Sequence, residues 1–187
     1  SFSAHKVYGP KGIGALYVGK RAAPLLQAQI HGGGHENGLR SGTLATHQIA
    51  AMGAAFALAG QVQQQEVARM HRLRERLLEQ LADIPGLGLN GSPVQRIPHT
   101  LSLTFGGDGI DLQALARTLA FSSTSACNSA SSAPSHVLLA LGHDERAARQ
   151  TLRLSLGRYT REEDIDAAAG AIHAALHNVP FWAVAHG

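Results

Sequence analysis

The sequence predicts an α/β fold, and two observations support this prediction. Strand-like and helix-like segments alternate along the second part of the chain, which is typical of α/β and α+β domains. In addition, 44% of the 187 residues are hydrophobic and only 16% are charged, a balance that suits a globular protein with one good core. The 21 glycines indicate tight turns and close helix packing rather than disorder.

Charge, hydropathy and cysteine content weigh against several classes of protein. The net charge is only +3, and no cluster of Lys and Arg is interleaved with aromatic residues, so nucleic acid is not an expected partner. No run of about 18 apolar residues occurs, so no membrane association is expected. Cys127 is the only cysteine, which excludes an intrachain disulfide and favours a reducing, cytoplasmic location.

The first part of the chain predicts a short strand, a loop and a helix. Ile13–Val18 is an apolar run after a turn, which is consistent with a buried strand. Residues 31–43 contain too many glycines for regular structure and predict a shaped loop. Residues 43–59 are rich in alanine and carry larger apolar residues at helical spacing, so we expect a helix there.

The second part of the chain has the clearest helical pattern. Apolar residues recur every three or four positions over 66–84, and Pro85 with Gly86 ends the pattern. Two strands with alternating apolar and polar residues and three further helices are expected after it. The strands are 101–105 and 151–156, and the helices are 110–119, 134–141 and a segment that runs from a Thr160–Glu163 capping box to Leu176.

A lysine near the start of the chain lies in an unusual setting. Lys6 follows His5 and precedes a Gly/Pro-rich turn and an apolar run, an arrangement that presents a lysine at the edge of a sheet. A lysine placed there can bind a carbonyl cofactor if it loses its proton. The alternative is a surface lysine in a turn, and local chemistry does not separate Lys6 from its neighbour Lys11.

Residues 3–14, Ser-x-His-Lys-x-Tyr-Gly-Pro-Lys-Gly-x-Gly, resemble the cofactor motif of the cysteine desulfurases almost position by position. In that family the lysine matching Lys6 binds pyridoxal 5'-phosphate (PLP), and the residues matching Ser3 and His5 contact its phosphate. The resemblance therefore implies PLP as the cofactor. It also implies that Lys6 is catalytic and cofactor-binding, with Ser3 and His5 as further cofactor-binding residues.

The glycine-rich loop allows two interpretations. Its backbone N–H groups, together with Arg40 and with Thr43 near a helix start, suit an anion-binding nest. His31 and His35 are four residues apart, but the glycines between them break the helix that such metal ligands need, so no metal site is predicted.

Residues 32–43 are also similar to a second signature of the desulfurases. The threonine that matches Thr43 in that family reaches the PLP phosphate of the other subunit. This resemblance implies that Thr43 binds the cofactor and that the protein is a homodimer. Asn37 stands where an arginine is common, so the contact made by that arginine is not expected here.

Cys127 lies in a Ser-rich loop, residues 121–133, that we expect to follow a brief strand. Small polar neighbours weigh against a packed core position and favour a solvated loop, in which the cysteine is either a nucleophile or an idle exposed thiol. The segment resembles the nucleophile loop of the long-loop desulfurases, which serve iron–sulfur cluster assembly. The resemblance implies that Cys127 is a catalytic nucleophile.

An arginine on the second predicted strand is a candidate ligand for a carboxylate. Alternation places Leu152 and Leu154 on the core face and Arg153 on the opposite face. A guanidinium facing a cleft suits bidentate carboxylate binding, and the alternative is a solvent-facing arginine. In the desulfurases the matching arginine binds the substrate α-carboxylate, which implies a substrate-binding role for Arg153. Arg158 is a second candidate.

The resemblance covers the chain to about Leu176 and implies the type I fold of PLP-dependent aminotransferases. On that template residues 1–60 are the C-terminal remnant of the large PLP-binding domain. Residues 61–187 are then the small C-terminal α+β domain. The implied reaction removes sulfur from L-cysteine, giving L-alanine and a persulfide on Cys127. A scaffold or carrier protein then accepts the sulfur for iron–sulfur cluster or thio-cofactor assembly.

Two alternatives stay open at this point. In the family, the aromatic residue that stacks on PLP and the acid that pairs with its ring nitrogen lie upstream of the lysine. The chain is therefore expected to be the C-terminal half of a larger protein. By itself it is either an inactive fragment or a non-catalytic module for dimerisation or for docking a sulfur acceptor. Selenocysteine lyase activity is the other alternative, with closely related chemistry.

Overall fold

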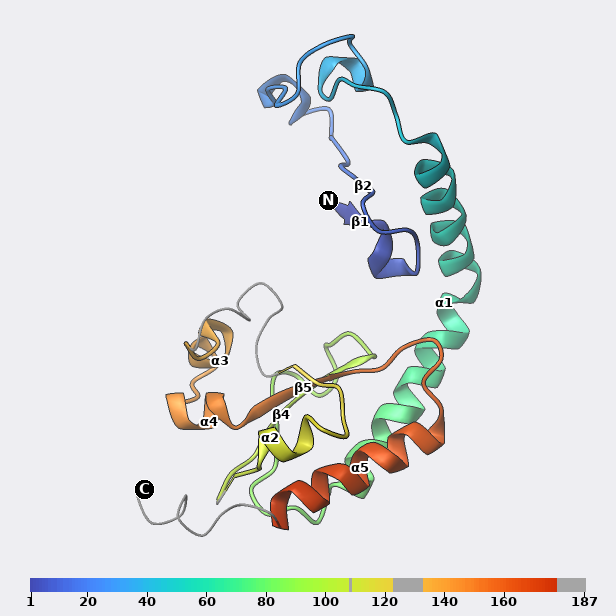
Figure 1. Cartoon of the computed structure of the whole chain (residues 1–187). Coiled ribbons are helices and arrows are strands. Elements are labelled where there is room, and N and C mark those ends of the chain that lie inside the picture. Colours follow the sequence, from blue (N-terminus) through green and yellow to red (C-terminus); the bar gives the residue numbers. More distant parts are fainter. Residues whose placement is uncertain (108, 123–132, 178–187) are drawn as a thin grey trace. The chain divides into compact units, whose positions relative to one another are not determined.

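A computed structural model describes residues 1–107, 109–122 and 133–177 (Figure 1). The chain divides into two compact units, Ser1–Gln64 and Gln65–Gly187, which we call the N-terminal unit and the C-terminal unit. Helix α1 (Thr46–Gln80) belongs to both. The predicted boundary between residues 60 and 61 falls inside this helix, and the assignment of two domains stays a prediction.

Two very short strands open the N-terminal unit. β1 (Phe2–Ser3) pairs antiparallel with β2 (Gly14–Ala15), and the 3-10 turn η1 (Ala4–Val7) starts the loop between them. The prediction of a buried strand over Ile13–Val18 is wrong in length and in burial, because only two residues are strand and Leu16 is exposed. Within the N-terminal unit β2 pairs only with the two-residue β1, which is too short to extend the ladder.

The glycine-rich residues 31–43 form an irregular loop, as predicted. A single 3-10 turn, η3 (Glu36–Gly38), lies within it, and an earlier turn, η2 (Ala23–Leu25), was not predicted. Ile30 and Arg40 join the two ends of the loop in a parallel bridge.

The two helices predicted over 43–59 and 66–84 are one continuous helix, α1, of 35 residues. The residues that join the two patterns, 60–65, contain one glycine and no proline, and four of them are glutamines, which favour helix. Nothing in this joint therefore ends the helix. In its C-terminal half Met70 and Leu77 are buried, as the spacing predicts.

The C-terminal unit contains a three-stranded antiparallel sheet with the order β3-β4-β5. β4 (Thr100–Thr104) and β5 (Thr151–Ser155) confirm the two predicted strands, and β3 (Gly88–Leu89) is an additional short edge strand. Alternating leucines of β4 and β5 lie opposite one another and share one face of the sheet. They are Leu101, Leu103, Leu152 and Leu154.

The described part of the C-terminal unit also contains four shorter helices. Helices α2 (Leu112–Leu115) and α3 (His136–Ala140) are shorter than predicted, whereas α5 (Glu162–His177) has about the predicted length. Helix α4 (Glu145–Arg149) was not predicted, although Asp144 is a favourable capping residue whose carboxylate accepts the N–H of the third helical residue at 2.7 Å.

The start of α5 differs from the predicted capping box. Thr160 Oγ1 accepts the N–H of Gly157 at 2.9 Å instead of capping the helix. Asp164 accepts the N–H of Arg161 at 2.9 Å, so the acidic residue that reaches back is one position later than Glu163. The hydroxyl of Thr160 is thereby committed to the turn before the helix.

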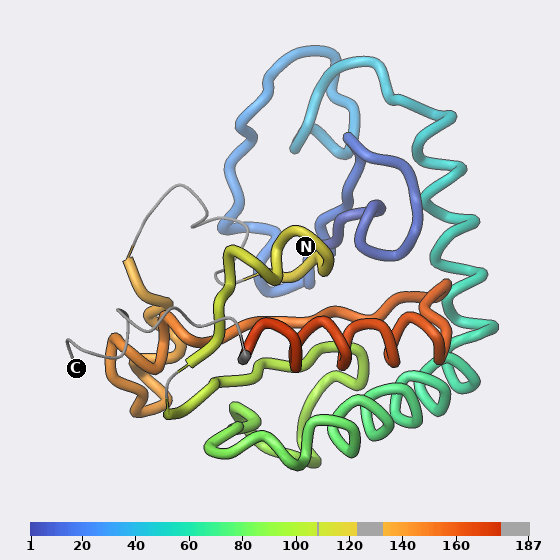
Figure 2. Tube along the Cα trace, turned by 60° about the horizontal axis from the view of Figure 1, so that its bottom comes forward, coloured from blue at the N-terminus to red at the C-terminus, as the bar shows by residue number. Residues whose placement is uncertain are grey.

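One apolar core stabilises the C-terminal unit. It lies between the leucine face of the sheet and helices α1 and α5, and Figure 2 shows α5 running alongside β5. Leu77, Leu103, Leu152 and Ile172 are at most 1% exposed in this core. Across the described ranges, none of the helices combines the length and apolar character needed to span a membrane.

Candidate active site

Lys6 lies in η1, inside a loop that backbone hydrogen bonds close at its base. The N–H of Ala4 donates to the carbonyl of Ile13 at 3.1 Å, and the N–H of Gly9 donates to the carbonyl of Ala4 at 2.9 Å. Ala4 is fully buried, which anchors the loop. His5 and Lys6 follow this anchor directly, and both are exposed. The loop therefore presents the lysine at the edge of a small hairpin.

Close backbone approach explains part of the glycine pattern around Lys6. A Cβ on Gly14 would lie 2.5 Å from the carbonyl oxygen of Phe2, so only glycine fits there. Tyr8 has a φ of 64°, a left-handed conformation that is uncommon for a bulky residue. Strained backbone of this kind is concentrated at functional sites, and here it lies two residues from Lys6.

The polar groups on this loop fit an aldehyde cofactor that carries a phosphate. Lys6 supplies a primary amine, which reacts with aldehydes, and His5 supplies an imidazole. Ser3 is half-buried, and its hydroxyl forms no capping hydrogen bond at the start of η1. In the part of the chain that the structure describes, no hydrogen bond or ion pair occupies the Lys6 amine. The three groups that the sequence predicts for PLP are therefore available on one closed loop.

Several donors of the glycine-rich loop are used within the loop itself. The N–H of Gly34 donates to Ser41 Oγ at 3.2 Å, and the N–H of Gly42 donates to His35 Nδ1 at 3.4 Å. Arg40 Nη1 donates to the carbonyl of Gly42 at 3.2 Å. These donors do not form an open anion nest. Among the residues that the structure describes, no group of three or more potential ligands is close enough for a metal ion.

Asn37 adopts a conformation that suits its side chain. Its φ of 54° and ψ of 35° lie in the left-handed region, where Asn is several-fold enriched. An arginine at this position would be less favourable in that conformation. The backbone thus gives a local reason for the departure of Asn37 from the desulfurase signature.

Thr43 lines a cavity of about 790 Å³ within the N-terminal unit. Residues of β2 and the first turns of α1, such as Gly14 and Gln48, contribute to the same lining, whereas Ser3, His5 and Lys6 do not. Within one chain, Thr43 therefore lies in a different environment from Ser3, His5 and Lys6.

Arg153 lies on β5 with its side chain exposed, opposite the buried Leu152 and Leu154, as the alternation predicts. Its backbone pairs on one side with Ser102 of β4 and on the other with Ser122. The N–H of Arg153 donates to the carbonyl of Ser122 at 2.6 Å, and the N–H of Ser122 donates back at 3.1 Å. Arg153 is thus held between two neighbouring segments.

Ser122 is also the last described residue before the segment that contains Cys127. Residues 123–132 lie outside the described residues, so the structure does not test the predicted loop or the position of Cys127. What it does place is the point from which this segment leaves the sheet, directly beside Arg153.

A buried polar network supports the sheet face that carries Arg153, and the sequence analysis missed it. Asn90 Nδ2 donates to Ser102 Oγ at 3.0 Å and to Thr104 Oγ1 at 2.9 Å. Thr104 Oγ1 lies 2.6 Å from Thr151 Oγ1. Ser102 and Thr104 alternate with the buried leucines of β4, and this alternation was the available signal. The network ties β4 and β5 to Asn90, the residue that follows β3, beside Arg153.

Comparisons with known proteins find similarity along nearly the whole chain. A sequence model of the Aminotransferase class-V family matches residues 1–168. Cysteine desulfurase IscS of Methylococcus capsulatus is 52% identical over 187 residues, covering 97% of this chain and 46% of that protein. Cysteine desulfurase IscS of Pseudomonas putida is 50% identical with the same coverage. The chain spans about half the length of the curated relatives it matches.

A solved structure shares the arrangement of the chain. A NifS-like protein superposes with a TM-score of 0.78 at 31% identity, covering 94% of this chain and 45% of that one.

Proposed function

The chain belongs to the class-V aminotransferase family, and from this membership we propose that it is part of a cysteine desulfurase that uses PLP to remove sulfur from L-cysteine. The observation that carries the proposal is the 52% identity to a cysteine desulfurase over 97% of the chain. Because the chain spans about half of that relative, the proposed activity is that of the whole product of the native gene.

We assign PLP binding to the Lys6 loop. PLP, when bound, supplies an aldehyde that reacts with amines and a ring that accepts electrons from the substrate. Lys6 is the amine for the aldehyde, and Ser3 and His5 are the donors for the phosphate. The closed base of the loop and the anchoring of Ala4 support this assignment, since they hold the three residues in a fixed relation. When L-cysteine is bound, Lys6 Nζ is free to take and return protons.

Thr43 is proposed to serve the cofactor of a second copy of the protein. It lines a cavity to which Ser3, His5 and Lys6 of its own chain do not contribute. A homodimer in which Thr43 of each copy contacts the phosphate held by the other accounts for this separation.

Arg153 is proposed to bind the α-carboxylate of L-cysteine. Its guanidinium is exposed, while its backbone is hydrogen-bonded on both sides. A planar fork on a fixed strand suits bidentate binding of a carboxylate, which orients the substrate as well as holding it.

Cys127 is proposed as the acceptor of the sulfur atom. Its thiolate attacks the sulfur of the substrate and forms an S–S bond, while the C–S bond breaks and leaves its electron pair on the substrate carbon. Protonation of that carbon gives L-alanine, and Cys127 keeps a persulfide. Cys127 is the fifth residue after Ser122, a separation that can span at most ~18 Å, which keeps the thiol within reach of the strand that bears Arg153.

Further expectations follow for the whole protein. The persulfide sulfur passes to a scaffold or carrier protein for iron–sulfur cluster or thio-cofactor assembly. The single cysteine and the small net charge of these 187 residues favour a cytoplasmic location without nucleic-acid partners.

The proposal is tested with the purified product of the native gene, supplied with PLP and L-cysteine. We expect visible absorbance from bound PLP and equal amounts of alanine and, with a thiol reductant present, sulfide. Lys6→Ala should abolish both, and Lys11→Ala, on the same loop, should keep both. Cys127→Ser should keep the absorbance and lose the sulfide.

Two results would contradict the assignments. Full sulfide release by Cys127→Ser removes Cys127 from the reaction. Unchanged visible absorbance in Lys6→Ala removes Lys6 from cofactor binding. Comparison of sulfide release from L-cysteine with selenide release from L-selenocysteine separates a desulfurase from a selenocysteine lyase.

A second candidate function concerns the chain by itself. Large apolar side chains of the N-terminal unit, such as Tyr17 and Leu25, are more than 75% exposed, which favours a module that binds another protein surface. If the isolated chain gains no visible absorbance with PLP yet forms a dimer, this non-catalytic role is supported for the fragment.

A further inference from the structure

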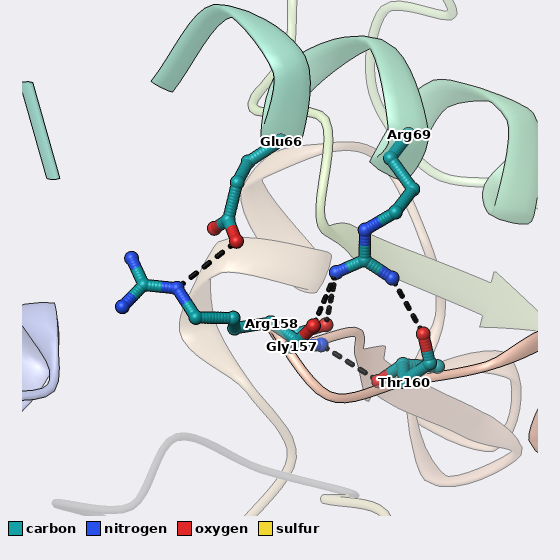
Figure 3. Close-up of polar contacts among 5 residues, drawn as sticks. All are labelled: Glu66, Arg69, Gly157, Arg158 and Thr160. Carbon is teal, nitrogen blue, oxygen red and sulfur yellow. Dashed lines mark hydrogen bonds and ion pairs between the residues drawn. The ribbon is translucent and has the colours of Figure 1, made fainter. Parts of the chain in front are cut away.

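We propose that Arg69 and Glu66, which lie one turn apart on α1, position strand β5 and thereby Arg153 by clamping the turn that follows the strand. The clamped turn consists of residues 157–160, and Figure 3 shows its contacts with α1. The clamp rests on contacts within the C-terminal unit. Its link to a substrate carboxylate rests on the proposed function.

Arg69 donates three hydrogen bonds to the turn. Its Nη1 donates to the carbonyl of Thr160 at 2.5 Å, and its Nη2 donates to the carbonyls of Gly157 and Arg158 at 3.1 and 2.6 Å. One guanidinium fork thus satisfies three backbone carbonyls from a half-buried position (Figure 3). Hydrogen bonds from a charged donor are shorter and stronger than neutral ones, so Arg69 is the main external support of the turn.

The turn is also closed by its own hydrogen bonds. The N–H of Thr160 donates to the carbonyl of Gly157 at 3.1 Å, and the N–H of Gly157 donates to Thr160 Oγ1 at 2.9 Å. A turn closed in this way moves as one piece. Whatever holds it therefore also holds the end of β5, which lies two residues before Gly157.

Glu66 adds an ion pair to the same turn. Its Oε1 lies 2.9 Å from Arg158 Nε, and the two side chains are only 25% and 18% exposed. Partial burial reduces solvent screening, so this pair contributes more than the exposed pairs of the chain. Arg158 is thus engaged with α1, which leaves Arg153 as the strand arginine available for a carboxylate.

The connection from the clamp to Arg153 is short and continuous. Hydrogen bonding continues past β5, where the N–H of Leu156 donates to the carbonyl of His99 at 2.8 Å. Arg153 is four residues from Gly157 along this bonded strand. A displacement of about 1 Å in a binding group is enough to weaken binding strongly. Arg69 itself contacts no substrate group and is a positioning residue.

The first test measures steady-state kinetics of the PLP-loaded product of the native gene with L-cysteine. Arg69→Ala should raise KM about tenfold and change kcat by less than about twofold, because ground-state binding of the carboxylate is what weakens. Arg69→Lys should give an intermediate KM, since an ammonium replaces the fork with a point donor. Arg72→Ala is the matched control, an exposed arginine three residues along the same helix, and should change neither constant.

The second test does not depend on activity. Amide hydrogen exchange in β5 should become about tenfold faster in Arg69→Ala, while exchange in the middle of α5 stays the same. Glu66→Gln keeps the size of its side chain and should produce a smaller change in the same strand. It also serves as the test variant if Arg69→Ala does not fold.

The two tests separate failure of the clamp from failure of the proposed function. Unchanged β5 exchange in Arg69→Ala overturns the clamp, even in an active desulfurase. Faster exchange with an unchanged KM overturns the link between the clamp and the carboxylate. A wild-type protein without desulfurase activity refutes the proposed function, and the exchange measurement still decides the clamp.

Discussion

The N-terminal and C-terminal units differ in how much apolar surface each can bury by itself. In the C-terminal unit fifteen buried residues form one cluster between the sheet and helices α1 and α5. In the N-terminal unit, all of which the structure describes, Ala4 is the only buried hydrophobic residue. Larger side chains there, such as Leu25 at 82% exposed, face solvent. Phe2 and Phe56 make an edge-to-face contact at 5.9 Å, but both are more than one-third exposed.

This difference follows from the amount of hydrophobic burial, the dominant favourable term in folding. The C-terminal unit has a closed core of its own, whereas the N-terminal unit has apolar side chains that need a surface outside the unit. The residues with proposed functional roles are also divided between the two units. Ser3, His5, Lys6 and Thr43, the cofactor residues, lie on the unit without a core, and Arg153 lies on the unit with one.

Amide hydrogen exchange should show the largest contrast between the units. Amides of the central strand β4 should exchange only through global unfolding, whereas amides of the loop at 31–43 should exchange through small local openings. We expect rates that differ by several orders of magnitude, measured by mass spectrometry on the whole chain. Equal protection in the two segments would mean that the N-terminal unit is stabilised by more than its own contacts.

Truncation of one apolar side chain in each unit should reproduce the contrast. Leu152 is fully buried between the sheet and the helices, so Leu152→Ala should destabilise the C-terminal unit by ~2–5 kcal/mol. Phe56→Ala removes a larger side chain that is 37% exposed and should cost less than about half as much. Urea unfolding followed by circular dichroism measures both. A larger effect from Phe56→Ala would reverse the comparison.

The C-terminal unit buries an arginine whose polar groups are not all hydrogen-bonded. Arg74 is 8% exposed, and its Nε and Nη1 have no hydrogen-bond partner among the residues that the structure describes. Burial, followed by repulsion from Arg74, also lowers the pKa of Arg96. Replacement of the unpaired polar group by an apolar side chain of similar length, Arg74→Met, should therefore stabilise the chain by ~1–3 kcal/mol.

Thermal unfolding of Arg74→Met compared with Arg72→Met gives the measurement and its control. Arg72 is exposed on the same helix, so its replacement should leave the midpoint nearly unchanged. A lower midpoint for Arg74→Met would indicate that the arginine has a partner in solution.

Acid sensitivity should give the smallest difference, and it also belongs to the C-terminal unit. Hydrogen bonds from Arg76 and Gln80 lower the pKa of Asp166 to about 2. Because the folded pKa lies below the ordinary value of 3.8, Asp166 stabilises the fold above about pH 4, and this contribution is lost as the pH falls towards 2. Asp166→Asn should remove this part of the pH dependence. Urea unfolding between pH 5 and pH 2 gives the free energy of unfolding of the variant and of wild type at each pH. If that free energy falls equally with pH in both proteins, Asp166 is not a source of the pH dependence.

The comparisons confirm the fold class that the sequence predicts, since the chain superposes on solved class-V proteins such as the NifS-like protein. Local patterns predicted the strands β4 and β5 and the exposure of Arg153, because alternation along a strand depends only on neighbouring residues. The roles of Lys6, Thr43, Arg153 and Cys127 stay predictions until the variants are measured.

Other features depended on distant contacts and could not be found in this way. The residues at 160–163 match a capping box, but the Thr160 hydroxyl accepts the N–H of Gly157 instead. That hydrogen bond lies in a turn to which Arg69, 91 residues away in sequence from Thr160, also donates. The sequence predicted two helices where the structure has one, α1. Each half of α1 has a clear helical pattern, but the residues between the halves neither favour nor exclude a break, so local sequence did not show that the helix continues.

The amino-acid order alone determined the periodicity of the two halves of α1, of β4, β5 and α5, the turn after Lys6 and the side of β5 that bears its arginine. Such features depend on backbone geometry and on residues a few positions apart. Only the tertiary structure decided which arginine is occupied and which is available. Arg158 is paired with Glu66 across 92 residues, and no local pattern encodes a contact between elements that packing alone brings together.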